Sequence, residues 1–250
     1  MQIAVIGTGY VGLVTAAVLA DQGNDVIAVD IDEEKVQGLK AGKMPFYEPG
    51  MEEMVTRNHA DGRLDFTSDT ADAVRRSEVI FICVDTPPAE DGTSDLSHVE
   101  GAAKAVAKAM NNHKVVVNKS TVPVGTGDLV GRILEENKPE GADFDVVSNP
   151  EFLREGNAIA DSLRPDRIVI GASNPQAALK LVELYAPLER QMLICDVESA
   201  EIIKYASNAY LATKISFINS IAELCEKVGA DVVQVVKGMG ADRRIGAEFL

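Results

Sequence analysis

Short, almost wholly apolar runs alternate with helical patterns along most of this chain, and this alternation constrains the fold most strongly. The apolar runs are Ile3–Ile6, Val26–Val29, Val79–Val84, Val115–Val117, Val146–Val147, Ile168–Ile170 and Met192–Cys195. Apolar residues recur at three- and four-residue steps in Val11–Asp21, Glu33–Ala41, Val99–Met110, Asp128–Glu136 and Gln176–Tyr185. Strands this apolar are buried on both faces, as in a parallel sheet covered by helices on both sides. The pattern therefore predicts a doubly wound α/β fold with a parallel sheet.

The pattern changes at Glu198, where a stretch of good helix formers without Gly or Pro runs as far as Gly229. This stretch predicts one long helix, whose apolar residues circle most of its surface and favour packing against other elements or a second subunit. Asp231 is a candidate N-cap for a shorter helix over Val232–Lys237. We therefore expect an α/β domain over residues 1–197. Over 198–250 we expect the long connecting helix and the start of an all-helical central domain.

The charge balance excludes some partners. With 39 acidic and 24 basic residues, the chain has a formal charge of −15, which is hard to reconcile with the basic stripe that nucleic acids or anionic membranes require. No run reaches the roughly 18 apolar residues that would span a bilayer, and the start, Met1–Gly7, lacks the basic region of a signal peptide. We expect a cytoplasmic protein with no nucleic-acid or membrane partner.

The cysteines and histidines give no metal signature. They are isolated in the sequence and show none of the close spacing of zinc ligands; they are Cys83, Cys195, Cys225, His59, His98 and His113. We predict no metal, and buried structural thiols.

A glycine-rich hexapeptide, Gly7-Thr8-Gly9-Tyr10-Val11-Gly12, follows the first apolar run and opens the first helical pattern. In this G-x-G-x-x-G context Gly7 permits a tight turn, Gly9 lets a pyrophosphate approach the backbone, and Gly12 lets helix and strand pack closely. The helix N-terminus offers N–H groups and a positive dipole to the anion. The motif predicts a Rossmann-type dinucleotide site.

Asp30 strengthens this prediction, because it ends the second apolar run and lies 18 residues beyond Gly12, near the usual spacing of about 20. A carboxylate there accepts hydrogen bonds from the adenosine ribose and repels a 2′-phosphate, which favours NAD over NADP. The alternative is a structural glycine turn followed by a solvated aspartate.

Further candidate ligand-binding loops follow later strands, where doubly wound sheets bind their ligands. They are Cys83–Pro88, Asn118–Gly127 and Ser148–Gly156, although ordinary turn chemistry explains each of them equally well. On the long helix, Lys204 and Asn208 are four residues apart and share a face. A lysine in such an apolar stretch is more often a snorkelling side chain than a catalyst.

Five ordered motifs resemble the UDP-glucose 6-dehydrogenase family over the entire length of the chain. They are Gly7–Gly12, Lys119–Gly125, Asn149–Gly156, Glu201–Asn208 and Asp242–Gly246. The resemblance implies a two-step, NAD-dependent oxidation of the C6 alcohol of UDP-glucose to UDP-glucuronate. In that family a cysteine captures the intermediate aldehyde, and the resulting thiohemiacetal is oxidised to a thioester that water hydrolyses. GDP-mannose and UDP-N-acetylmannosamine are the alternative sugars.

The resemblance also assigns the residues of the dinucleotide site. Besides the three glycines, contacts to NAD are implied for Tyr10, Val11, Asp30, Lys35, Thr86 and Thr121, with Glu155 near the nicotinamide end. Thr121 is also implied at the reaction centre, and Glu151 would position the hydrolytic water or act as general base.

The implied substrate site draws on both parts of the chain. Lys204 and Asn208 would stabilise oxyanion charge at the reacting carbon. The other substrate contacts implied are Glu151, Phe152, Leu153, Glu155, Arg244, Phe249 and Leu250, with Arg244 reaching the substrate across a dimer interface. The long helix resembles the element that forms the family's homodimer.

The chain departs from the family pattern because it ends before the Gly-Gly-Ser-Cys-x-Pro-Lys-Asp motif that carries the nucleophile. We therefore expect an N-terminal portion of a longer enzyme that cannot complete the oxidation alone. Two other functions remain open: a different two-domain NAD dehydrogenase, for instance one acting on hydroxy acids, and a non-catalytic NAD-binding module.

Overall fold

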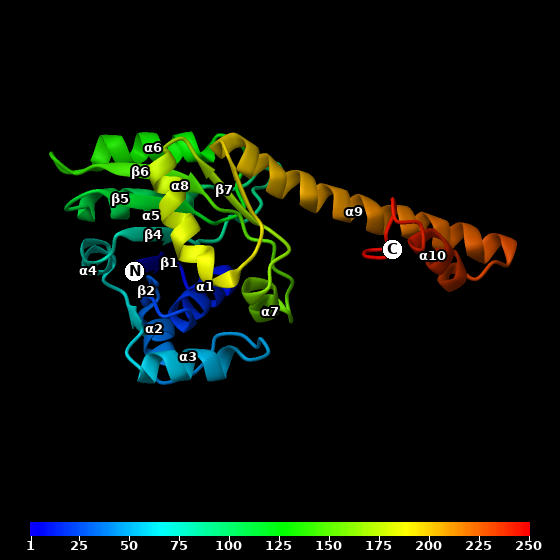
Figure 1. The fold of residues 1–250 in the computed structure, drawn as a ribbon, viewed down its shortest axis with the longest axis horizontal. Helices are drawn as coiled ribbons and strands as arrows, with labels where there is room; N and C mark the ends of the chain where they lie inside the picture. Colours follow the sequence, from blue (N-terminus) through cyan, green and yellow to red (C-terminus); the bar gives the residue numbers. More distant parts are fainter. The chain divides into compact units, whose positions relative to one another are not determined.

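A computed structural model describes residues 1–250 and divides the chain into two compact units, Met1–Ile202 and Ile203–Leu250. The first unit is built on an eight-stranded sheet in the order β3-β2-β1-β4-β5-β6-β7-β8 (Figure 1). The strands are β1 (Gln2–Ile6), β2 (Asp25–Val29), β3 (Leu64–Thr67), β4 (Val79–Ile82), β5 (Lys114–Asn118), β6 (Phe144–Ser148), β7 (Ile168–Ala172) and β8 (Met192–Cys195). The order reverses between β1 and β4, which is the switch point of a doubly wound sheet.

Strand direction divides the sheet into two parts. Strands β1 to β6 are parallel to one another, whereas β7 is antiparallel to β6, and β8 is parallel to β7. The β6–β7 pairing is short and joins only the ends of the strands, Val147 with Ala172 and Ser148 with Gly171. The predicted α/β fold with a following long helix is confirmed, with a reversal of the last two strands that the sequence pattern did not predict.

Helices cover both faces of the sheet. Helices α1 (Tyr10–Asp21), α2 (Glu33–Lys40), α3 (Met51–Ala60), α7 (Ala158–Leu163) and α8 (Pro175–Tyr185) contribute buried residues to one core. Helices α4 (Thr70–Arg76), α5 (Ser97–Ala109) and α6 (Thr126–Asn137) contribute to the core on the opposite face, and a 3₁₀ turn (Ala186–Leu188) follows α8.

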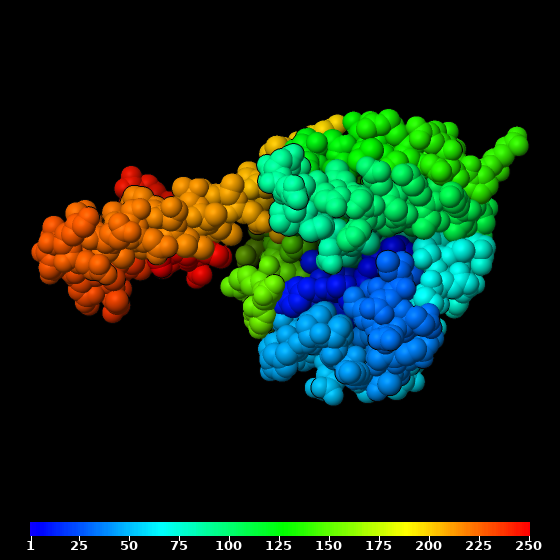
Figure 2. All heavy atoms as spheres, turned by 180° about the vertical axis from the view of Figure 1, so that it is seen from behind, coloured from blue at the N-terminus to red at the C-terminus, as the bar shows by residue number.

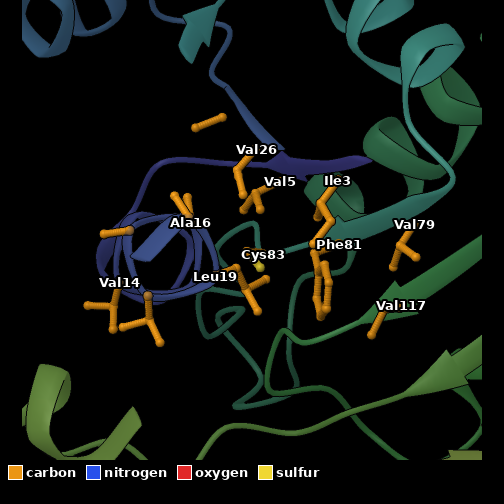
Figure 3. Packing of buried hydrophobic residues seen from close by; sticks show 14 of the residues in the cluster. Ile3, Val5, Val14, Ala16, Leu19, Val26, Val79, Phe81, Cys83 and Val117 are labelled. Atoms are coloured by element: carbon orange, nitrogen blue, oxygen red, sulfur yellow. The ribbon is translucent and has the colours of Figure 1, made fainter. Parts of the chain in front are cut away.

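The two cores follow from the alternation of side chains along each strand. On β1, Ile3 and Val5 enter the first core, whereas Ala4 and Ile6 enter the second. Figure 3 shows Ile3, Val5 and Phe81 among the packed side chains of the first core. Because both faces of β1 are buried from Ile3 to Ile6, these four residues are all apolar, and this run made the strand recognisable in the sequence.

The long helix is α9 (Val197–Val228), which begins in the first unit and continues into the second. Asp231 caps the shorter helix α10 (Val232–Gly240), and its carboxylate accepts the Val233 N–H at 2.9 Å. The long helix and the shorter capped helix predicted from the sequence are both present, whereas the domain boundary at residues 197/198 stays a prediction. Although α9 has 32 residues, none of the helices is long and apolar enough to cross a membrane.

Candidate functional site

The glycine turn between β1 and α1 leaves no room for larger side chains. Gly7 has a φ of +97°, and a Cβ there would lie 2.7 Å from the Cys83 carbonyl oxygen. A Cβ on Gly12 would lie 1.9 Å from the Gly7 carbonyl oxygen. A Cβ on Gly9 would lie 3.2 Å from Asp85 Oδ1, on the loop that follows β4. The turn therefore keeps strand, helix and loop in close contact, as the motif predicts.

The N-terminus of α1 is open for a ligand. Gly9 is its N-cap, and no side chain caps the helix. The first N–H groups of a helix have no intrahelical partners and carry a partial positive charge, which suits a pyrophosphate. In Figure 2 the dark-blue N-terminal segment lies in a hollow between lighter-blue and green segments. The cradle fits the phosphates of a dinucleotide.

Asp30 follows β2 directly and is held from three directions. Its Oδ2 accepts the Thr8 N–H at 3.0 Å, the Thr8 hydroxyl at 2.6 Å and the Lys35 ammonium at 2.8 Å. Its Oδ1 accepts the Asp32 N–H at 3.1 Å. A carboxylate oxygen has two lone pairs, so Oδ1 keeps one for a ribose hydroxyl. Asp30 and Lys35 thus lie together, and Thr8 ties the pair to the glycine turn.

These contacts keep Asp30 ionised. Burial opposes its ionisation, but the hydrogen bonds from Lys35, Thr8 and Asp32 outweigh it and lower the pKa to about 2. In Rossmann folds a fixed negative charge at the end of the second strand selects against a 2′-phosphate on the adenosine ribose.

The loops after β4 and β5 meet at the same edge of the sheet. The Thr86 hydroxyl donates to the Thr121 carbonyl oxygen at 2.8 Å, and the Ser120 hydroxyl donates to the Val84 carbonyl oxygen at 2.7 Å. The structure therefore brings together two of the residues predicted to contact the dinucleotide, one from each loop.

The loop after β6, Asn149–Asn157, is anchored at its start by a buried asparagine. Asn149 donates to the Val169 carbonyl oxygen at 2.8 Å, and its Oδ1 accepts the Tyr185 hydroxyl at 2.6 Å and the Lys119 ammonium at 3.2 Å. Asn149 thereby extends the β6–β7 contact past the end of β6, and fixes where the loop leaves the sheet.

Within this loop the predicted residues have distinct surroundings. The Glu151 carboxylate accepts the Leu153 N–H at 2.6 Å. The Arg167 guanidinium carbon lies over the Phe152 ring, 3.9 Å from the centroid of the ring. Leu153 packs against the first core. Glu155 is exposed.

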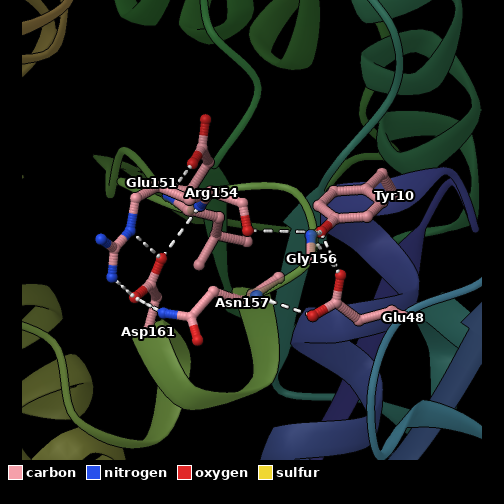
Figure 4. A network of polar contacts seen from close by, with 9 residues as sticks. Tyr10, Glu48, Glu151, Arg154, Gly156, Asn157 and Asp161 are labelled. Carbon is pink, nitrogen blue, oxygen red and sulfur yellow. Dashed lines mark hydrogen bonds and ion pairs between the residues drawn. The ribbon is translucent and has the colours of Figure 1, made fainter. Parts of the chain in front are cut away.

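A buried glutamate outside the predicted set, Glu48, joins this loop to the glycine turn (Figure 4). Its carboxylate accepts the Tyr10 hydroxyl, the Gly156 N–H at 2.9 Å and the Ala158 N–H at 2.8 Å. Burial and the Glu48 carboxylate raise the pKa of Tyr10 to about 12, so the phenol remains a donor. A sequence signal for Glu48 exists in hindsight: a carboxylate in a Glu-Pro-Gly turn directly before α3.

A second buried glutamate, Glu201, fastens the start of α9 to α6. Its carboxylate accepts the Gly125 N–H at 2.7 Å and the Gly127 N–H at 2.8 Å. A Cβ on Gly127 would lie 2.4 Å from Val197 Cγ1, so the two helices need a glycine where they meet. Burial raises the pKa of Glu201. Its place in the Glu201–Asn208 motif was noted from the sequence, but its contact with α6 was not predicted.

The remaining predicted residues lie in the second unit. Lys204 and Asn208 are one turn apart on α9, as predicted. Arg244 is exposed and forms a double hydrogen bond to the Asp242 carboxylate, whose closest contact is 2.6 Å. Phe249 has a φ of +65° and stands beside Leu250 at the end of the chain.

The three cysteines are free, and the structure shows no group of three His, Cys, Asp or Glu side chains placed to hold a metal ion. Burial raises the pKa of the Cys83 thiol to about 12, which makes it a poor nucleophile.

The sequence and the structure were compared with those of known proteins, and a dehydrogenase family matches. Residues 1–189 match the family model described as "UDP-glucose/GDP-mannose dehydrogenase family, NAD binding domain", and residues 198–250 match the central domain of the same family. UDP-glucose 6-dehydrogenase TuaD from Bacillus subtilis is 53% identical, over 100% of this chain and 54% of that protein. UDP-glucose 6-dehydrogenase from Rhizobium meliloti is also 53% identical, over 100% of this chain and 58% of that protein.

Solved structures agree with these matches. A UDP-glucose dehydrogenase from Pyrobaculum islandicum has a TM-score of 0.96 and 43% identity, over 99% of this chain and 58% of that one. A ternary complex of GDP-mannose dehydrogenase from Pseudomonas aeruginosa has a TM-score of 0.95 and 37% identity, over 98% of this chain and 57% of that one. The chain thus spans about half the length of the relatives it matches.

Proposed function

Because this chain belongs to the UDP-glucose/GDP-mannose dehydrogenase family, we propose that it serves the NAD-dependent oxidation of UDP-glucose to UDP-glucuronate. In this proposal residues 1–197 hold NAD and residues 198–250 contribute to the nucleotide-sugar site. The family and the NAD cofactor predicted from the sequence are both confirmed by the family match. UDP-glucose is favoured over GDP-mannose and UDP-N-acetylmannosamine by the relatives at 53% identity.

The observation that carries the proposal is the connected site at the β1–β2 edge. The turn admits no Cβ at Gly7 or Gly12, α1 begins without a side-chain cap, and Asp30 is held ionised beside it by Thr8 and Lys35. NAD, when bound, supplies the hydride acceptor for the oxidation. The chain's own residues bind its pyrophosphate at α1, bind its adenosine ribose at Asp30, and exclude a 2′-phosphate.

The remaining roles are part of the same proposal. Thr86, Thr121 and Glu155 contact the dinucleotide, with Thr121 also at the reaction centre. Lys204 and Asn208 stabilise negative charge on the reacting oxygen, and Glu151 positions the hydrolytic water or acts as base. The other substrate contacts are Phe152, Leu153, Arg244, Phe249 and Leu250. We assign no covalent role to the three cysteines of this chain. The homodimer through α9 and the cytoplasmic location stay predictions.

Calorimetric titration of the chain with NAD and with NADP tests the cofactor site. We expect micromolar to millimolar affinity for NAD and at least about tenfold weaker binding of NADP, because the Asp30 carboxylate repels the 2′-phosphate. Equal affinity for the two dinucleotides, or binding of neither, would contradict the assignment of Asp30.

An activity assay on the product of the complete reading frame tests the reaction. With UDP-glucose as substrate we expect two NADH per sugar and accumulation of UDP-glucuronate, with slower turnover of GDP-mannose and UDP-N-acetylmannosamine. Oxidation of a hydroxy acid in their place would favour the other type of dehydrogenase. Binding of NAD without oxidation of any of these compounds would favour a non-catalytic module.

A further inference from the structure

Glu48 connects two segments that are far apart in the sequence and belong to different halves of the sheet. It lies between α2 and α3, in the half formed by β1, β2 and β3. Two of its three donors, the Gly156 and Ala158 N–H groups, lie beyond β6 in the other half, 108 and 110 residues along the chain. The third donor, the Tyr10 hydroxyl, belongs to the first residue of α1. The carboxylate therefore holds the far end of the Asn149–Asn157 loop against the start of α1.

The Glu48 contact is buried and is supported by neighbouring side chains. Glu48 is 4% exposed and Ala158 is fully buried, so loss of the carboxylate would leave the Ala158 N–H buried without a hydrogen-bond partner. The Tyr10 hydroxyl also lies 3.1 Å from the Gly156 nitrogen, and the Phe46 ring packs on the Tyr10 ring with centroids 5.0 Å apart. Figure 4 shows Tyr10 and Gly156 on one side of the Glu48 carboxylate and the start of α7 on the other.

The strand order of the sheet indicates which half of a dinucleotide the Glu48 contact would affect. A doubly wound sheet binds one mononucleotide on each side of the switch point, here between β1 and β4. Asp30, at the end of β2, assigns the adenosine to the β1–β3 side. The nicotinamide nucleotide then lies on the β4–β6 side, where the Asn149–Asn157 loop follows β6.

We propose that Glu48 is a positioning residue for the nicotinamide half of NAD, acting through the Asn149–Asn157 loop. This inference rests on the proposed NAD site. Glu48 fixes the loop at Gly156 and Ala158, while Asn149 fixes it where it leaves β6. The adenosine ribose is held elsewhere, by Asp30 together with Thr8 and Lys35.

The variant Glu48→Gln separates these two halves. The glutamine amide nitrogen is a donor and would face an N–H or O–H donor on one side, so the loop loses one anchor while the side-chain volume is unchanged. The matched control is Glu52→Gln, an exposed glutamate in the first turn of α3. Both variants and the wild-type chain are titrated with NAD and with ADP-ribose, which lacks the nicotinamide.

For Glu48→Gln we expect about a tenfold rise in the Kd for NAD and less than about a twofold change in the Kd for ADP-ribose. The control should bind both ligands like the wild type. Unchanged NAD binding, or an equal loss for both ligands, would overturn the inference, because a merely structural role has no reason to spare ADP-ribose.

Two further results keep the test decisive. If Glu48→Gln does not fold, Glu48→Asp keeps the charge but shortens the side chain by one methylene, and it is judged by the same comparison of ligands. If the wild-type chain binds neither NAD nor ADP-ribose, the proposed function itself is wrong. If the wild type binds both and the variants do not discriminate, only the role of Glu48 is wrong.

Discussion

Replacement of Asp30 by asparagine should destabilise the first unit by an amount that depends on pH. Asparagine resembles the neutral form of the acid. The variant therefore loses the extra stabilisation that Thr8, Lys35 and Asp32 give to the negatively charged Asp30 carboxylate. The pKa of Asp30 falls from its ordinary value of 3.8 to about 2, and its side chain is only 12% exposed. A shift of this size corresponds to about 2 kcal/mol of unfolding free energy at neutral pH.

The direction of the pH dependence follows from the protons that Asp30 binds in the folded and unfolded states. A carboxyl with a depressed pKa in the folded state contributes its full stability above its unfolded pKa and loses it as the pH falls through the folded pKa. The difference in unfolding free energy between wild type and Asp30→Asn should therefore shrink by about 1 kcal/mol, roughly half its value, between about pH 5 and pH 3.

Urea unfolding followed by circular dichroism, at both pH values and at neutral pH, measures this difference. Asp25→Asn is the matched control, because Asp25 is an exposed aspartate at the start of the same strand. A difference for Asp30→Asn that is constant from pH 5 to pH 3, or absent at neutral pH, would refute the reasoning.

Three more predictions concern two glycines and the thiols. Gly12→Ala places a Cβ against the Gly7 carbonyl oxygen and should abolish NAD binding and lower the urea midpoint of unfolding. By contrast, a Cβ on Gly101 in α5 would meet nothing within 4 Å, so Gly101→Ala should stabilise the chain by up to about 1 kcal/mol. Gly12→Ala with wild-type NAD affinity would show that the turn does not need its third glycine. Cys195 is partly exposed and Cys83 buried, so Cys195 should react first with an aromatic disulfide reagent, and Cys195→Ser should remove the fast phase. A fast phase that survives this substitution would contradict the assignment.

Much of the fold could be predicted because the central strands are buried on both faces. Strands such as β1 and β4 are apolar at every buried position and stand out in the sequence. Strand β3 lies at the edge of the sheet and alternates buried with exposed residues over four positions, so it contains too few apolar residues to be recognised. Helix α4 is short and largely polar, and was missed for the same reason.

The candidate site divides in a similar way. The glycine turn and Asp30 could be found because they are local and their spacing follows from one strand–helix–strand unit. The contacts of Glu48 could not, since its donors lie 38, 108 and 110 residues away and depend on how the loop after β6 returns to α1. The reversal of β7 could not be predicted either, because an apolar run has no direction.

That reversal has a consequence for which residues of the fold can vary. A parallel neighbour of β6 would require the connection to cross to the opposite edge of the sheet before the next strand begins. Here β7 starts at the edge where β6 ends, so the connection, including α7, stays at the edge of the sheet where strands β1 to β6 end. Residues 159–167, beyond the loop that Asn149 and Glu48 hold, can therefore change in length and composition without altering the pairing of β1 to β6.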